Sequence, residues 1–314
     1  MMRRFLIFLV FGISLLNLSC SGCSSQGRTD CCGSDSVSLV PSGNVNAVYY
    51  WKTTFSLDSV EEHFLHQHHI NKLYCRYFDV VMTDEDIPMP NATIRFLQSV
   101  PDTLEIVPTV FIMNDCMQEH HDSLAQRIVK RIVQMNATNE VSHVNEIQMD
   151  CDYTARNRQL YYQFLEEVRN EARANGLSLS ATIRLHQLSM SVPPVDYGVL
   201  MLYNTGDPNR LFDKKASRES LRNPILDLRD VKPYLRHLKD YPLPLAAAYP
   251  VFQWQRTVHG VDILHVADYE EISRVKQLVE VEREDVRRLI ITYHLDKENI
   301  NRYTSEQYEN IYYH

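Results

Sequence analysis

Two aspartates, Asp150 and Asp152, stand two residues apart at the end of a predicted strand over residues 144–152. Successive side chains of a strand point to opposite faces, so both carboxylates share one face with Glu146 and Gln148. A buried parallel strand is ordinarily apolar on both faces. Neighbouring carboxylates repel each other, so a proton can be shared and one group can act as a general acid or an electrostatic stabiliser. This strand therefore predicts a functional site.

The same acidic face also has a structural interpretation. Arg76 and Arg184, on two other predicted strands, could neutralise Asp150 and Asp152 in ion pairs inside the fold. Ion pairs of this kind need no ligand. The spacing of the residues leaves both interpretations open.

Eight predicted strands alternate with segments of helical periodicity, which is typical of βαβ units with a parallel sheet. We predict strands at 46–55, 72–82, 105–113, 144–152, 177–185, 196–203, 243–252 and 288–293. Helices are expected at 57–68, 91–99, 122–135, 158–174, 231–238 and 269–281. Gly176 should end the fourth helix in a left-handed conformation. The eight units predict an α/β fold, a single closed (β/α)8 TIM barrel over residues 44–314.

Composition and missing motifs argue against several other folds and ligands. A doubly wound open sheet would usually carry a phosphate loop after its first strand, and neither GxGxxG nor GxxxxGK[ST] occurs in this chain with nine glycines. The formal charge is −8 and the basic residues are scattered, so we expect no nucleic-acid partner. The cysteines form no pair of CxxC motifs. We therefore predict no metal and no cofactor.

In a TIM barrel the site is built by residues at the carboxyl ends of the strands. Here these ends carry carboxylates, arginines, amides and many aromatic rings. Aromatic rings can stack on the apolar faces of sugars, while carboxylates and amides bind the hydroxyl groups. This set predicts a glycan or oligosaccharide ligand. Besides Asp150, Asp152 and Tyr203, the candidate substrate-binding residues are Trp51, Arg76, Asp79, Arg184, His186, Asn204, Tyr249, Trp254 and His294.

Two motifs carry a resemblance to a known family. Strand four ends in Asp150-Cys151-Asp152, and strand six reads Met201-Leu202-Tyr203-Asn204. The chain thus resembles the chitinase-type glycoside hydrolases of family 18, which are (β/α)8 barrels with D-x-x-D-x-D-x-E on strand four and M-x-Y-D or M-x-Y-N on strand six. In that family the last Glu protonates the glycosidic oxygen, while the last Asp and the Tyr hold the nucleophilic N-acetyl group. The resemblance implies that Asp150, Asp152 and Tyr203 are the catalytic positions.

The chain also departs from that family. Ile147 stands at the first Asp of the signature and Thr154 stands at the catalytic Glu, and a threonine cannot donate a proton at a useful pKa. The family's Ser-x-Gly-Gly on strand three is replaced by Val-Pro-Thr-Val at residues 107–110. Other carboxylates that could occupy the place of the missing Glu are Asp79, Asp115, Asp207, Asp268 and Glu270.

Three hypotheses follow from this comparison. The first is a glycoside hydrolase-like enzyme with a degenerate acid/base motif, in which Asp152 is the acid/base, Asp150 its partner and Tyr203 a substrate-positioning residue. The second is a catalytically inactive barrel that binds a glycan. The third is a structural envelope lipoprotein with an ion-paired barrel interior.

The N-terminus predicts export and lipidation. Residues 1–19 have a basic head and a short apolar run, as in a bacterial lipoprotein signal peptide, and Cys20 follows as the expected lipidated residue. Cys23 is the alternative acceptor, and a plain secretory signal is the alternative segment. Residues 20–43 are rich in Ser, Gly and Asp and are expected to form a flexible tether. We therefore expect a lipid anchor in the membrane of the bacterial cell envelope.

Overall fold

The computed structural model describes residues 47–206, 222–258 and 261–291, with the backbone alone at 254–258, 261–263 and 287–291. These residues all belong to one compact unit, Ser38–His314. The predicted signal peptide, Cys20, Cys23 and residues 20–43 of the tether lie outside the described residues. Within the described ranges no helix is long and apolar enough to cross a membrane.

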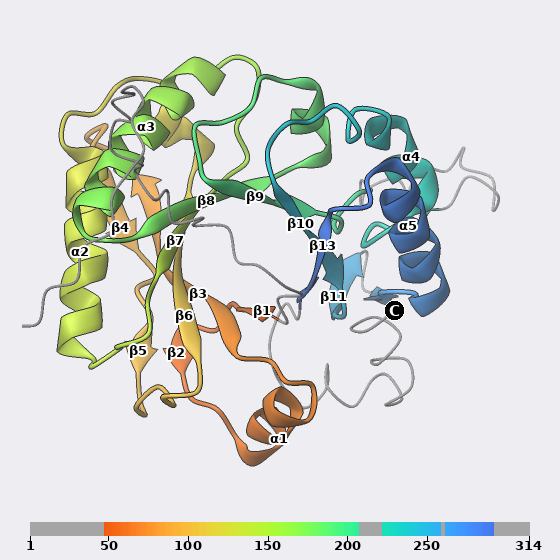
Figure 1. Cartoon of the computed structure of the whole chain (residues 1–314), viewed down its shortest axis with the longest axis horizontal. Coiled ribbons are helices and arrows are strands. Elements are labelled where there is room, and N and C mark those ends of the chain that lie inside the picture. Colours follow the sequence, from red (N-terminus) through yellow and green to blue (C-terminus); the bar gives the residue numbers. More distant parts are fainter. Residues whose placement is uncertain (1–46, 207–221, 259–260, 292–314) are drawn as a thin grey trace, which may run out of the picture. The chain divides into compact units, whose positions relative to one another are not determined.

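Eight parallel strands follow one another in chain order in one curled sheet (Figure 1). Neighbouring strands pair in parallel, and the last strand, β13, contacts the first, β1. This is the TIM-barrel-like fold that the sequence predicted. The strands are β1 (Ala47–Tyr50), β3 (Lys72–Met82), β6 (Glu105–Ile112), β7 (Glu146–Cys151), β8 (Ser178–Ile183), β9 (Tyr197–Met201), β10 (Leu245–Pro250) and β13 (Arg287–Ile291).

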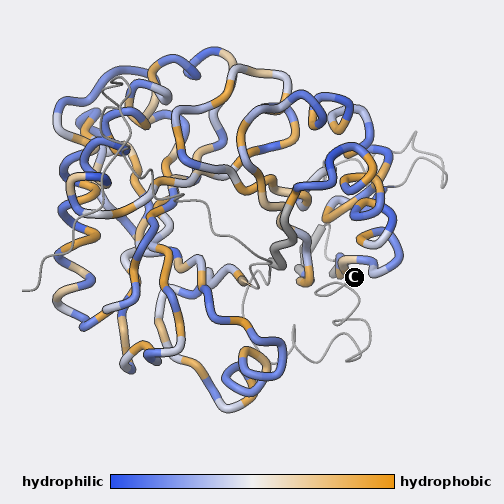
Figure 2. The backbone as a smooth tube through the Cα atoms, viewed as in Figure 1, coloured by the Kyte–Doolittle hydropathy of each residue, from blue (hydrophilic) through white to orange (hydrophobic). Residues whose placement is uncertain are grey.

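The helices confirm most of the predicted pattern. They are α1 (Ser59–Gln67), α2 (Leu124–Thr138), α3 (Arg158–Ala174), α4 (Leu228–Leu235) and α5 (Tyr269–Glu282), with short 3-10 helices η1 (Asn114–Met117) and η2 (Leu185–Ser189). Hydrophobic and hydrophilic residues alternate along α2 and α3, and the buried positions recur at helical spacing (Figure 2). Gly176 has φ +73° after the end of α3, as predicted.

The connection between β3 and β6 differs from the prediction. The helix expected at 91–99 is wrong, because this segment instead holds the antiparallel strand β4 (Pro88–Asn91) and the short strand β5 (Arg95–Phe96), which pairs with β2 (Thr54–Phe55). Pro88 and Pro90 favour the extended backbone of β4, and pairing with β2 keeps Arg95 and Phe96 extended as well. The connection after β10 also contains a hairpin for which no strands were predicted, β11 (Gln253–Val258) with β12 (Val261–Val266).

A polar network fills the interior of the barrel toward the amino ends of its strands. Lys72 Nζ lies 2.6 Å from Glu146 Oε2, and both side chains are almost fully buried. Burial alone would lower the pKa of the Lys72 ammonium, but Glu146 and Glu105 outweigh this effect and raise the pKa above its usual value. Ser180 donates a hydrogen bond to Glu146 at 2.5 Å, and Tyr49 donates one to Gln148 at 2.8 Å. The polar face of β7 is therefore internally satisfied along most of its length.

Asp196 joins α3 to the strand that follows it. Its carboxylate accepts hydrogen bonds from the backbone N–H of Leu179 at 2.9 Å, from Arg169 at 2.8 Å and from Arg173 at 3.1 Å. Burial alone would raise the pKa of Asp196, but these hydrogen bonds outweigh it and hold the pKa below its usual value. A group whose pKa is lowered by folding stabilises the fold above its unfolded pKa, and this contribution is lost as the pH falls through the folded pKa.

We therefore expect Asp196→Asn to lower the free energy of unfolding by about 2 kcal/mol at pH 7, since charge-assisted hydrogen bonds are lost. As the pH falls below about 4 the difference from the wild type should shrink, because the unfolded wild-type chain then binds a proton that the folded protein, with its lowered Asp196 pKa, must release. Urea unfolding at pH 7 and pH 3 measures both values. A difference that does not change with pH would contradict the assigned role.

Candidate functional site at the carboxyl ends of the strands

A cavity of about 530 Å³ opens where the carboxyl ends of the barrel strands meet. It brings together eight residues that the sequence singled out: Trp51, Arg76, Asp150, Asp152, Arg184, His186, Tyr203 and Asn204. The other lining residues are Phe111, Leu185, Met201, Thr205 and Tyr234. Charged, amide and aromatic side chains from β3, β7, β8 and β9 or the segments just after them therefore converge on one space.

The two aspartates of β7 have different surroundings although they share a strand face. The Asp150 side chain is 3% exposed and accepts hydrogen bonds from Thr182 Oγ1 at 2.6 Å and Arg184 Nη2 at 3.1 Å. The Asp152 side chain is 63% exposed, and its contact with Arg184 Nε is an ion pair at 3.8 Å. Asp150 is thus a fixed internal acceptor, whereas Asp152 is an exposed carboxylate at the border of the cavity.

Arg184 connects the ends of β7, β8 and β9. Burial alone would lower the pKa of its guanidinium, but Asp150, Tyr203 and Asp152 outweigh this and raise the pKa above its usual value. The Arg184 backbone N–H donates to Gln187 Oε1 at 2.8 Å, and Gln187 Nε2 donates to the carbonyl of Tyr153 at 3.0 Å. The arginine is therefore a permanent cation, held in place by the segment that follows Asp152.

A β-bulge in β3 brings Arg76 and Asp79 to the same face. Arg76 pairs with Thr109, yet Phe78 pairs with Val110, so β3 contains one extra residue at this point. Residues three apart normally point to opposite faces of a strand, but after the bulge they point to the same one. Arg76 Nε donates to Asp79 Oδ1 at 2.7 Å, and a second contact joins Nη2 to Oδ2. Arg76 borders the cavity, while Asp79 does not.

Aromatic side chains support the cavity wall. The Trp51 ring stacks on Tyr49 with centroids 5.5 Å apart and an interplanar angle of 7°. Tyr49 in turn stacks on Tyr74 at 4.8 Å. Tyr203 meets Phe252 edge to face at 5.8 Å. These contacts fix the orientations of Trp51 and Tyr203, two of the rings that border the cavity.

Asn204, which directly follows Tyr203, has a left-handed backbone with φ +51°. Asn tolerates this conformation better than most residues. The strained turn at the end of β9 therefore lies at the cavity, where Asn204 and Thr205 both border it.

Three other predicted site residues are not placed at the cavity. Tyr249 is 1% exposed. Its neighbour Ala248 pairs with the cavity residue Met201, so Tyr249 points to the opposite face of β10. The side chain of Trp254 and the whole of His294 lie outside the described residues.

The structure also places the carboxylates considered for the missing Glu. Thr154 bonds to Asn157 and does not border the cavity. Asp79 is held by Arg76, and Asp115 accepts from the backbone N–H of Cys116 at the start of η1. Asp207 lies outside the described residues.

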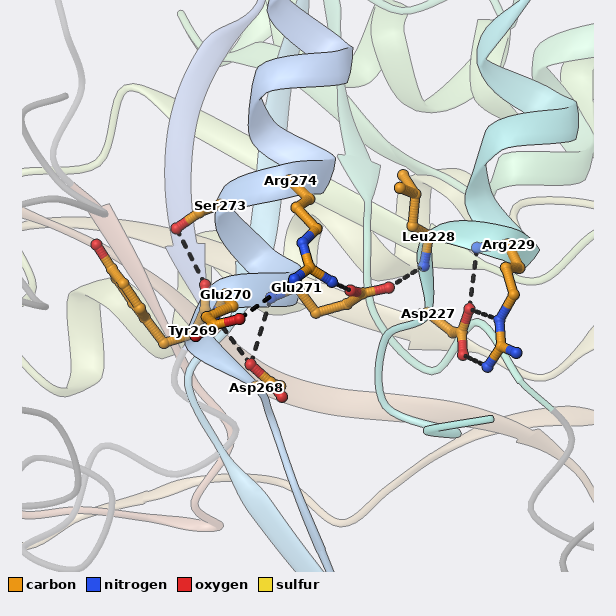
Figure 3. A network of polar contacts seen from close by, with 9 residues as sticks. All are labelled: Asp227, Leu228, Arg229, Asp268, Tyr269, Glu270, Glu271, Ser273 and Arg274. Atoms are coloured by element: carbon orange, nitrogen blue, oxygen red, sulfur yellow. Dashed lines mark hydrogen bonds and ion pairs between the residues drawn. The ribbon is translucent and has the colours of Figure 1, made fainter. Parts of the chain in front are cut away.

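Asp268 and Glu270 belong to a separate polar network at the amino ends of α4 and α5 (Figure 3). Asp268 caps α5 by accepting from the N–H of Glu270 at 2.9 Å, and Arg274 lies 3.2 Å from Glu270. In the same network the N–H of Leu228 donates to Glu271 at 2.6 Å. Neither Asp268 nor Glu270 borders the cavity. Among the described residues, Asp150 and Asp152 are therefore the carboxylates that border it.

Four lining residues were not singled out in the sequence, and a fifth, Met201, was noted only as part of the strand-six motif. Phe111 has a signal in the sequence, since it shares a strand face with Thr109 and lies opposite Asp150 in the parallel pair β6–β7. Leu185, Thr205 and Tyr234 lie on η2, a loop and α4, where strand alternation gives no information.

Comparison with known proteins bears on the fold. The sequence matches no family profile and no curated protein. Among solved structures, it is similar to the spore cortex-lytic enzyme SleL of Bacillus megaterium, with a TM-score of 0.53 and 10% identity over 83% of this chain and 73% of that one. It is also similar to a chitinase from Chromobacterium violaceum, with a TM-score of 0.50 and 11% identity over 82% and 96% of the two chains. The C-terminal domain of a putative chitinase from Desulfitobacterium hafniense gives a TM-score of 0.50 and 8% identity over 82% and 96%. The chain thus has the fold of the chitinase-like glycoside hydrolases.

Proposed function

We propose that this protein is a carbohydrate-active barrel that binds an oligosaccharide in the cavity at the carboxyl ends of its strands. The observation that carries the proposal is the convergence of aromatic rings, carboxylates, arginines and an amide on one space of about 530 Å³. Ligand sites of TIM barrels lie at this end of the strands. The chitinase-like fold of the chain supports a sugar as the ligand.

Each side chain has a role that its surroundings support. Trp51, stacked on Tyr49, offers a fixed ring for the apolar face of a sugar. Asp152 and Asn204 are exposed in the cavity and can bind hydroxyl groups. Arg184 and Asp150 keep Tyr203 and the end of β7 in a defined geometry before a ligand arrives.

Hydrolysis of the bound glycan is the second candidate function. The observation that favours it is the position of Asp152, whose carboxylate is exposed in the cavity two residues from the buried Asp150. In this mechanism Asp152 would be the acid/base, Asp150 its electrostatic partner and Tyr203 the positioning residue. Inactive binding is the alternative, because Thr154 stands at the position of the family's catalytic Glu and does not border the cavity.

Binding and turnover are tested together on the purified full-length protein. The probes are N-acetylglucosamine oligomers, cello-oligosaccharides and oligogalacturonates, titrated by calorimetry and then analysed for shorter products. Saturable binding with products supports hydrolysis, and binding without products supports the inactive binding barrel. A protein that binds none of the three classes would contradict the proposal.

We expect Trp51→Ala to weaken binding of the glycan by about tenfold, because the stacking surface is lost. Trp51→Phe is the matched control, since it retains a ring and should bind more tightly than the alanine variant. Melting curves of both variants separate lost binding from lost folding. Equal affinity of Trp51→Ala and the wild type would remove Trp51 from the site.

The location of the protein is also a proposal. The signal-like residues 1–19 and Cys20 support a lipid anchor in the bacterial cell envelope. Metabolic labelling with a fatty acid should mark the wild type and Cys23→Ala but not Cys20→Ala. Label that persists in Cys20→Ala and disappears in Cys23→Ala would transfer the anchor to Cys23, and an unlabelled wild type would exclude the anchor.

A further inference from the structure

A histidine borders the cavity together with the aspartates of β7. His186 belongs to the short helix η2, and its half-buried side chain lines the same space as Asp152. In the part of the chain that the structure describes, the carboxylates considered for the place of the missing Glu do not border this space. A proton donor for hydrolysis is therefore to be found among the other groups that line it.

Most of the titratable groups at the cavity are poorly suited to donate a proton. Asp150 is 3% exposed and already accepts hydrogen bonds from Thr182 and Arg184. Asp152 is an exposed carboxylate beside the Arg184 cation, and a carboxylate accepts a proton but has none to give. Arginine and tyrosine side chains ordinarily keep their protons at neutral pH, which applies to Arg76, Arg184, Tyr203 and Tyr234. Histidine side chains, in contrast, ordinarily exchange a proton within the range of about pH 5 to 8.

The chain segment that carries Asp152 holds one ring nitrogen of His186. His186 Nε2 lies 3.3 Å from the carbonyl oxygen of Tyr153, and Gln187 Nε2 donates to the same oxygen at 3.0 Å. A carbonyl only accepts, so His186 Nε2 carries a hydrogen in this contact. Tyr153 directly follows Asp152 and does not border the cavity. The contact therefore fixes the imidazole beside the segment from which Asp152 projects.

The second ring nitrogen of His186 is left for a ligand. Among the residues that the structure describes, Nδ1 has no hydrogen-bond or ion-pair partner. Because Nε2 keeps its hydrogen, Nδ1 is the atom that takes up and releases the proton. The backbone is held as well, since the carbonyl of His186 accepts a hydrogen bond from Ser189 Oγ at 3.0 Å. The cavity thus has an oriented imidazole and an exposed carboxylate on adjoining segments.

We propose that His186 is the general acid of glycan hydrolysis in this cavity and that Asp152 is the general base. This inference rests on hydrolysis, the second candidate function, and divides its acid/base role between two residues. Protonated Nδ1 donates its proton to the glycosidic oxygen, while the bond from that oxygen to the anomeric carbon breaks and leaves its electron pair on the oxygen. A water molecule bonds to the anomeric carbon and loses a proton to Asp152. Exchange with solvent then returns a proton to Nδ1 and removes one from Asp152.

The test compares substrates that differ in their need for an acid. The leaving group of a glycosyl fluoride is fluoride, which needs no proton, whereas an oligosaccharide leaves as an alcohol. Turnover is measured on the purified full-length protein with the oligosaccharide panel and with glycosyl fluorides of the same sugars. His186→Gln should slow oligosaccharide turnover by about a hundredfold and fluoride turnover by less than about threefold. Asp152→Asn should slow both reactions, because both require attack by water.

A matched control and a rescue experiment accompany this comparison. His66→Gln changes an exposed histidine on α1, outside the cavity, and should keep the wild-type turnover of both substrates. His186→Ala leaves space in the cavity, so added imidazole should restore part of the oligosaccharide turnover. Imidazole should not restore the turnover of Asp152→Asn. Melting curves identify the variants that are folded.

The outcomes separate this inference from the proposed function. Wild-type oligosaccharide turnover by a folded His186→Gln variant would overturn the assignment and leave hydrolysis intact. Equal slowing of both substrates by this variant would also overturn it, because the loss would not concern the leaving group. Binding without products in the wild type would overturn the assignment together with hydrolysis and leave the glycan site intact. Failure to bind any glycan would overturn the glycan site as well.

Discussion

Lys72→Met should lower the free energy of unfolding by about 3–5 kcal/mol, because it leaves the carboxylate of Glu146 buried without its cation. The two side chains are 4% and 2% exposed, so solvent screens their interaction little. Ser180 Oγ would remain as a hydrogen-bond donor to Glu146, but it carries no compensating charge. Urea unfolding of the purified variant measures the loss.

The double variant Lys72→Met with Glu146→Leu is the control for this effect. Replacing a buried ion pair with apolar side chains is often neutral or even stabilising, so the double variant should regain much of the lost stability. Lys52→Met tests a pair whose lysine is 28% exposed, and it should cost less. A mild effect of Lys72→Met would show that water reaches this end of the barrel interior.

Asp150→Ala and Asp152→Asn should show that two carboxylates on the same face of β7 have different roles, the first in stability and the second in function. Asp150→Ala removes the acceptor of Thr182 and the carboxylate of Arg184, and we expect it to cost about 2–4 kcal/mol of stability. Asp152→Asn changes an exposed side chain, so its stability should stay within about 0.5 kcal/mol of the wild type. If the barrel hydrolyses its glycan, Asp152→Asn should slow turnover by about a hundredfold or more.

Urea unfolding and product analysis on the two variants give the required measurements. Asp84→Asn, an exposed aspartate on the turn after β3, is the control for a general effect of lost charge. Unchanged turnover in Asp152→Asn would remove its assigned role as acid/base. A stable Asp150→Ala variant would contradict the structural role of the Asp150–Arg184 pair.

The two interpretations of the acidic strand face apply to different parts of it. Glu146 and Gln148 belong to the internal network, because Lys72, Ser180 and Tyr49 satisfy them. Asp152 is exposed in the cavity, and Asp150 lies between these two environments. The alternation of β7 predicted which residues share a face, but depth along the barrel axis decides which of them meet solvent.

The regular elements of the barrel could be predicted because their patterns are local. β3 begins at Lys72 and ends at Met82 as expected, and α3 spans Arg158–Ala174 as expected. The segment at 91–99 could not be predicted from its apolar residues, because pairing of β4 with β3 and β5 with β2 overrides the local preference. Strand pairing is a long-range interaction that a local pattern does not contain.

The identity of the residues that line the cavity could be predicted better than their arrangement. Strand ends gave eight of the lining residues, since a barrel brings all of its strand ends together. The bulge that turns Asp79 toward Arg76 depends on the register between β3 and β6, and no residue type near it marks the extra position. The partnership of Arg184 with both aspartates likewise depends on side-chain reach between strands.

The central claim is that the cavity above Asp150 and Asp152 binds a glycan. Calorimetric titration of the full-length wild type and of Trp51→Ala with the oligosaccharide panel tests it most directly. We expect saturable binding of at least one glycan by the wild type, and about tenfold weaker binding by a Trp51→Ala variant with an unchanged melting curve. Binding of no glycan by the wild type, or equal affinities of the two proteins, would contradict it.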